Sequence, residues 1–81
     1  MIFVSLLSPK GKGKEAVDFL KNLKAPKGIK IHNICVTFGR YDGVILFEAP
    51  DAKTALNFAL EIGFATDNII ETLSAVPVKE L

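Results

Sequence analysis

The sequence has a single cysteine and almost no excess of either charge. Cys35 alone excludes an internal disulfide and suits a reducing compartment. Ten basic residues against nine acidic ones leave a formal net charge of +1, so no global field attracts nucleic acid or an anionic membrane. No uncharged apolar run approaches the length of a membrane span, and the N-terminus lacks the basic region and cleavage site of a signal peptide. We therefore expect a cytoplasmic protein without nucleic-acid or membrane partners.

Small size and apolar composition together predict an assembly. The 81 residues form one domain, residues 1–81, and a domain of this size buries only about 60–65% of its unfolded surface. Yet 49% of the residues are hydrophobic. Because a small monomer has few interior positions, we expect the excess to cover a subunit interface in a homodimer or a higher homo-oligomer.

Hydrophobic periodicity predicts four strands and two helices. The expected strands span residues 2–7, 29–38, 43–49 and 68–76, and the expected helices span 14–23 and 52–63. Asp51 is placed to cap the second helix. That helix is expected to bury Ala55, Leu56, Phe58, Ala59 and Ile62. The order strand, helix, strand, strand, helix, strand predicts an α+β, ferredoxin-like βαββαβ fold: a four-stranded antiparallel sheet with two helices on one face.

In this topology the first and third strands lie at the centre of the sheet. Both are apolar on their two faces, whereas strand 29–38 is mixed on both faces, which suits an edge strand. The helices cover only one face of the sheet. We therefore expect the other face to pack against the sheet of a second subunit.

Residues 39–51 combine a tight turn, a buried strand and a helix cap. Gly39 and Asp42-Gly43 supply the chemistry of a hairpin turn. The pattern Gly39-x-Tyr41-Asp42, an apolar strand, then Glu48-Ala49-Pro50-Asp51 resembles the GYD domain family of small dimeric α/β-barrel proteins. The resemblance covers the chain from Gly39 onward, continuing through Ala55, Ala59 and Leu60 and ending in Glu71-Thr72-Leu73-Ser74-Ala75.

The N-terminal half departs from that pattern, with a short first connection and a helix of about three turns. It is more similar to the ligand-sensing domain of leucine-responsive and asparagine-type regulators, which share the Gly-x-Tyr-Asp turn and the dimeric barrel. The GYD resemblance implies a fold and no established reaction. The sensor resemblance implies a small-molecule site at a subunit interface near this hairpin, so Gly39, Tyr41 and Asp42 are the first candidates to face a ligand.

Arg40, Tyr41 and Asp42 bring a guanidinium, a phenol and a carboxylate to one rim. Such a set could hold the two ends of a zwitterion. A purely structural interpretation is favoured over this one, because Asp before Gly is ordinary hairpin chemistry and a Tyr can pack across a dimer with its hydroxyl in water.

Glu48 and Glu71 each interrupt an apolar strand, and a carboxylate there must be paired, solvated or perturbed. With His32 they could form a metal or acid–base set, although nothing in the spacing brings the three together. We predict no catalytic residue, no metal site and no cofactor. The tentative ligand-binding residues are Gly39, Arg40, Tyr41, Asp42, Glu48, Glu71 and Thr72.

The segment Gly11-x-Gly13 follows a strand and opens a helix, as a dinucleotide-binding turn would. The acidic residue expected about twenty positions later is missing, and so is the parallel βαβαβ setting. Lys10, Lys12 and Lys14 could attract an anion to the helix N-terminus, but a solvated loop is the favoured interpretation.

Three function classes follow from these residues. The leading one is a small-metabolite binding or regulatory module that acts as a homo-oligomer. The alternative is a small dimeric-barrel enzyme with acid–base or metal chemistry in the cleft beside the sheet, and the sequence favours a non-enzyme. The third is a structural oligomer without a ligand. RNA binding is rejected, because third-strand positions that need aromatic residues hold Asp42 and Val44.

Overall fold

The computed structural model of the chain describes residues 1–9 and 13–81. The predicted solvated loop around Lys10, Gly11 and Lys12 lies outside the described residues. The elements are β1 (Ile2–Pro9), α1 (Gly13–Lys21), β2 (Lys30–Val36), β3 (Gly43–Glu48), α2 (Ala52–Thr66), β4 (Asn68–Ala75) and a short 3₁₀ turn, η1 (Val78–Glu80). This order confirms the predicted ferredoxin-like βαββαβ arrangement.

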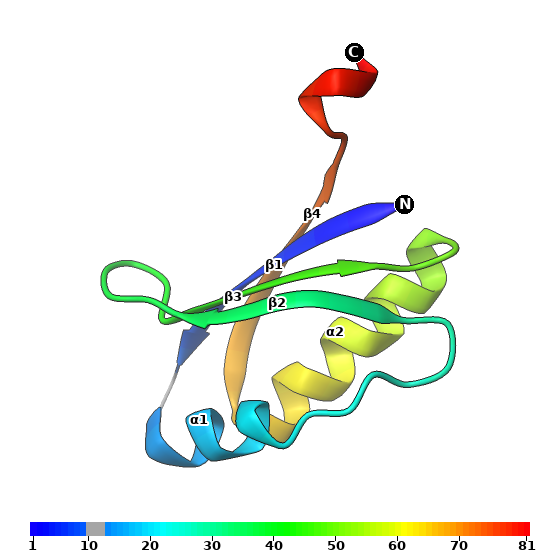
Figure 1. Ribbon diagram of the computed structural model, residues 1–81. Coiled ribbons are helices and arrows are strands. Elements are labelled where there is room, and N and C mark those ends of the chain that lie inside the picture. Colours follow the sequence, from blue (N-terminus) through cyan, green and yellow to red (C-terminus); the bar gives the residue numbers. More distant parts are fainter. Residues whose placement is uncertain (10–12) are drawn as a thin grey trace.

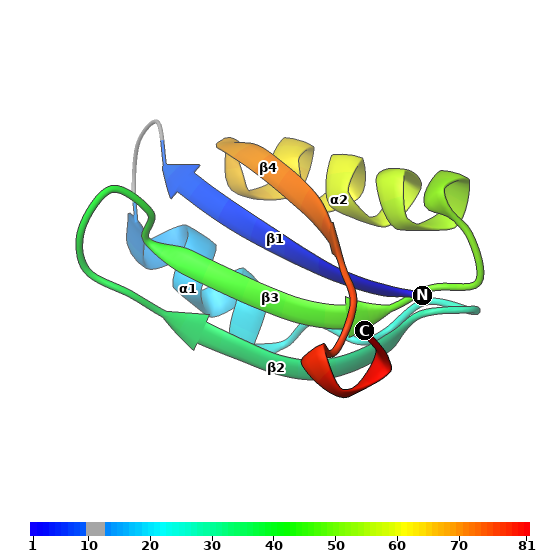
Figure 2. The same ribbon diagram turned by 90° about the horizontal axis from the view of Figure 1, so that it is seen from above.

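All strand pairs of the sheet are antiparallel, and the strand order is β2-β3-β1-β4. The expected central position of β1 and β3 and the edge position of β2 are therefore confirmed. Both helices lie on one side of the sheet (Figure 1). Figure 2 shows the sheet with both helices behind it. Neither α1 nor α2 has the length and apolar character needed to cross a membrane.

The core lies between the sheet and the helices, where alternate residues of the central strands point. Ile45 and Phe47 of β3 are fully buried. The Phe47 ring stacks on Phe3 with a centroid distance of 5.6 Å, and Phe58 of α2 meets it edge-on at 4.9 Å. These aromatic contacts fix α2 against the two central strands, because each ring pair adds a preferred geometry to its buried area.

The opposite, helix-free face is also largely apolar at its centre. By strand register, it carries Ile2, Val4 and Leu6 from β1, Val44 and Leu46 from β3, and Ile69 and Leu73 from β4. Leu46, Leu73 and Ile69 are 36%, 46% and 55% exposed. The C-terminal turn η1 projects from this side, opposite the helices (Figure 1), and leaves Val78 and Leu81 exposed.

A β-bulge in β2 changes which of its residues face the helices. The register with β3 shifts between Ile31 and Asn33, so Ile31 and Ile34 both lie opposite buried residues of β3. A strict alternation of side chains places Ile31 and Ile34 on different faces of the sheet. The extra residue inserted by the bulge turns the strand and moves the following side chains to the other face.

Helix α2 begins at the predicted cap and runs further than expected. The Thr54 N–H donates to Asp51 Oδ1 at 2.8 Å, and this hydrogen bond lowers the pKa of Asp51. The helix ends at Thr66, where Asp67 adopts a left-handed conformation with φ 52° and its N–H donates to the Gly63 carbonyl. The expected burial of Leu56 is wrong, because 56% of that residue is exposed. Leu60 and Phe64, which follow Leu56 at helical spacing, are also exposed on the outer side of α2.

Candidate functional site

The turn between β2 and β3 is fixed by hydrogen bonds within the hairpin and to β1. Thr37 Oγ1 donates to the Tyr41 carbonyl at 2.6 Å, and the Thr37 N–H donates to the Asp42 carbonyl at 2.9 Å. The Asp42 N–H donates to the Leu7 carbonyl at 2.8 Å. Gly39 has φ 130°, which L side chains rarely adopt, so glycine suits this turn. Tyr41 and Asp42 are thereby held in place beside β1.

Tyr41 lies on the helix-free side of the sheet. Its hydroxyl donates to Glu71 Oε2 at 2.7 Å, and Glu71 lies opposite Leu6, which points away from the helices. The hydrogen bond to Glu71 raises the pKa of Tyr41, and nearby Arg40 partly offsets this effect. The phenol is therefore held in its neutral, donating form.

The other acidic candidate, Glu48, lies at the far end of the same face. His32 Nε2 donates to Glu48 Oε2 at 2.5 Å, and both side chains are partly exposed. Glu48 lies opposite Ile2 and Glu71 opposite Leu6, four residues apart along β1, which corresponds to about 13 Å. His32 is thus joined to Glu48 but not to Glu71. Within residues 1–9 and 13–81, no three His, Cys, Asp or Glu side chains gather to hold a metal ion.

Thr72 lies on the helix side of the sheet, unlike its neighbour Glu71. Its hydroxyl is 2.8 Å from Ser5 Oγ, and Ser5 is 1% exposed. A buried hydroxyl needs a partner, and here the two hydroxyls satisfy each other across β1 and β4. Thr72 therefore has a structural role in this conformation.

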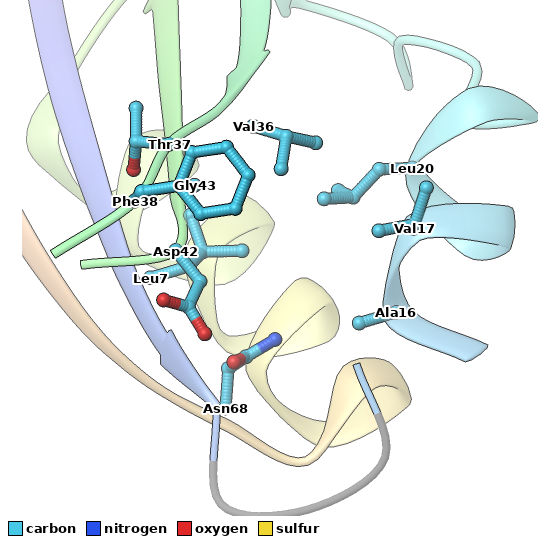
Figure 3. Close-up of a pocket in the computed structure, with 10 residues that line it drawn as sticks. All are labelled: Leu7, Ala16, Val17, Leu20, Val36, Thr37, Phe38, Asp42, Gly43 and Asn68. Carbon is cyan, nitrogen blue, oxygen red and sulfur yellow. The ribbon is translucent and has the colours of Figure 1, made fainter. Parts of the chain in front are cut away.

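Asp42 lines a cleft of about 220 Å³ between α1, the β2–β3 turn and the start of β4 (Figure 3). Most of its lining is apolar, from Leu7, Ala16, Val17, Leu20 and Val36, together with the fully exposed Phe38 of the turn itself. Its polar residues are Thr37, Asp42 and Asn68. Apolar walls with a few polar groups at one end are typical of small-molecule sites.

The polar end of the cleft contains an unsatisfied group. Asn68 Nδ2 donates to Thr66 Oγ1 at 2.6 Å, whereas Asn68 Oδ1 is buried without a hydrogen-bond partner. Figure 3 shows the Asp42 carboxylate pointing toward Asn68. Sequence reasoning missed Asn68 as a candidate. In the sequence, Asn68 is recognisable only as a polar residue at the start of an apolar strand, a pattern that is also typical of an ordinary turn.

The candidate residues thus occupy several separate places. Tyr41 hydrogen-bonds to Glu71 at one end of the helix-free face, and His32 to Glu48 at the other end. Asp42 lies in the cleft on the helix side. The remaining candidates are Thr72, which pairs with Ser5, and Gly39 and Arg40, which are exposed in the turn.

The family model described as GYD domain matches residues 6–81 of the chain. The match includes α1 and β2, so it reaches further into the N-terminal half than the resemblance from Gly39 onward predicted. Comparison with curated proteins and with solved structures finds no match. The similarity to the sensor domains of leucine-responsive regulators remains a prediction.

Proposed function

Because the chain belongs to the GYD domain family, we propose that it is a homodimeric binding module in which a small molecule in the cleft alters the packing of two subunits. One observation carries this proposal. Tyr41 and Asp42 are consecutive, yet Tyr41 hydrogen-bonds on the helix-free side and Asp42 lines the cleft on the helix side. One peptide bond therefore connects the proposed ligand site to the proposed interface.

The dimer is supported by the character of the helix-free face. Its centre is formed by partly exposed aliphatic side chains on all but the edge strand β2, and hydrogen-bonded polar pairs, Tyr41–Glu71 and His32–Glu48, lie at its two ends. An apolar centre within a polar rim is the usual anatomy of a stable protein interface. Exposed apolar side chains gathered on one face of a small domain often mark a protein–protein contact.

The C-terminal turn adds to this face. Val76, Val78 and Leu81 are 58%, 83% and 91% exposed, and η1 projects on the helix-free side (Figure 1). In a sheet-to-sheet dimer, this apolar segment would lie beside the partner subunit. Its side chains would then be buried by association.

The regulatory mechanism would be thermodynamic linkage. A ligand that binds the dimer more tightly than the monomer stabilises the dimer, and dimerisation tightens ligand binding by the same factor. The hydrogen bonds from Thr37 to the carbonyls of Tyr41 and Asp42 make the turn a rigid unit. A shift of Asp42 on ligand binding would therefore also move Tyr41.

Native mass spectrometry of the purified protein, without added ligand, tests this function. We expect a mass twice that of the 8.8 kDa chain, or a further multiple of two. Sedimentation velocity over a range of protein concentrations provides the solution control. A folded monomer at all concentrations would contradict the proposal, because the apolar face would then be stable in water.

A further inference from the structure

The geometry of the cleft points to a ligand class. We propose that it binds a small primary amine with a compact apolar body, whose ammonium group donates hydrogen bonds to Asp42 and Asn68. This inference rests on the proposed function, which makes the cleft the ligand site. The inference adds the chemical class of ligand that the cleft would bind.

The first argument is the number of hydrogen-bond acceptors at the polar end. The Thr66 hydroxyl donates to the Ile62 carbonyl at 2.6 Å, so it must accept from Asn68 Nδ2. This chain of donors fixes the amide orientation, and Asn68 Oδ1 is left as a buried acceptor without a donor. A buried unsatisfied acceptor is costly, so a ligand that supplies a donor gains affinity there.

Asp42 provides the second acceptor and the charge. Its backbone N–H and carbonyl are used by Leu7 and Thr37, and within the described part of the chain no hydrogen bond to its carboxylate is formed. A carboxylate can only accept hydrogen bonds, so this side chain needs a partner that donates. An ammonium offers three donors and a positive charge, so it satisfies both groups at once. A ligand carboxylate would instead face the like charge of Asp42.

The third argument is the size and lining of the remaining space. The cleft volume is about 220 Å³, and the walls away from Asp42 and Asn68 are formed by aliphatic side chains of α1, β1 and β2. An apolar cavity of about 150 Å³ accommodates benzene. The cleft therefore suits a body slightly larger than benzene, such as a branched aliphatic chain.

The test is an NMR titration of the ¹⁵N-labelled full chain with three probes that share a branched body: 3-methylbutylamine, 3-methylbutan-1-ol and 4-methylpentanoate. We expect the amine to shift the amide signals of Val17, Leu20, Asp42 and Asn68, which lie around the cleft. The alcohol keeps one donor but no charge, so we expect it to bind about tenfold more weakly. The carboxylate should leave these signals unchanged.

Asp42→Asn keeps the side-chain size and removes the charge. We expect it to weaken amine binding about tenfold and to leave alcohol binding unchanged. Asp18→Asn is the matched control, because Asp18 is an exposed residue of α1 that does not line the cleft. The control should bind the amine as the parent chain does. The probe series on the parent chain decides the question even where Asp42→Asn disturbs the turn.

The outcomes separate this inference from the function on which it rests. Preference for the alcohol or the carboxylate at the same residues would overturn the amine assignment and keep the cleft as a binding site. An absence of shifts with all three probes would overturn the amine assignment and the ligand part of the proposed function. The dimer is judged independently by its mass.

Discussion

Replacing Leu46 by lysine is expected to dissociate the proposed dimer without unfolding the subunit. Leu46 lies on the central strand β3, opposite Val4 on β1 and Asn33 on β2, and points away from the helices. It is 36% exposed in the single subunit, so a lysine there can extend its ammonium into water. In a sheet-to-sheet dimer the same ammonium would be enclosed.

The loss of association free energy is large because the substitution occurs in both subunits of the dimer. A symmetric dimer contains the substitution twice, and each ion loses several kcal/mol of hydration when it is buried without a partner. Taking about 3 kcal/mol for each of the two ions gives about 6 kcal/mol, which weakens association about ten-thousandfold. A dissociation constant in the nanomolar range would move into the range of tens of micromolar.

Sedimentation equilibrium at several protein concentrations measures this change, and circular dichroism confirms that the variant is folded. Leu56→Lys is the matched control, since Leu56 is 56% exposed on the outer side of α2, away from the helix-free face. We expect the control to associate like the parent chain. A folded Leu46→Lys variant with an unchanged dissociation constant would refute a dimer built on this face.

Three further predictions concern hydrogen bonds of the subunit. The hydrogen bond to Glu71 raises the pKa of Tyr41 above its ordinary value of 10.0. The stability that this pair contributes is therefore present below pH 10 and is lost as the pH rises through the pKa of Tyr41 in the folded protein. Urea unfolding across pH 8–12 should show this loss in the parent chain and not in Tyr41→Phe. Thr72→Val leaves the Ser5 hydroxyl buried without its partner and should lower the free energy of unfolding by about 1–3 kcal/mol, whereas adding Ser5→Ala should restore most of it, as measured by a double-mutant cycle. Because helix capping lowers the pKa of Asp51 below its ordinary 3.8, its stabilisation is present above that pH and lost as pH falls through the folded pKa. Acid unfolding of Asp51→Ala followed by circular dichroism should lack this component.

The arrangement of the elements could be predicted because local and long-range signals agree. Asp51 caps the helix that follows it, and the two central strands are apolar on both faces, as their position in the sheet requires. The β2 faces could not be predicted, because the bulge at Ile31–Asn33 breaks the period of two. The predicted burial of Leu56 is wrong because helical spacing alone does not distinguish a buried stripe from an exposed apolar one.

The candidate site was predicted in its residue types more than in its geometry. The turn motif predicts Tyr41 and Asp42 as candidates. It does not predict that Tyr41 lies on the helix-free side of the sheet and Asp42 on the helix side. Glu71 and Thr72 are both predicted ligand-binding residues, although strand alternation places them on opposite faces of the sheet. Asn68 was missed because its significance depends on Oδ1 losing access to water, which only tertiary packing determines.

The bulge in β2 also makes the two edges of the sheet unequal as sites for strand addition. On β2 the register is interrupted between Ile31 and Asn33, so an incoming strand would meet an irregular row of donors and acceptors. On β4 the eight residues Asn68–Ala75 are in unbroken register with β1, and in the described part of the chain their outer edge has no neighbouring strand. The β4 edge is therefore the more regular of the two for pairing with a strand of another molecule.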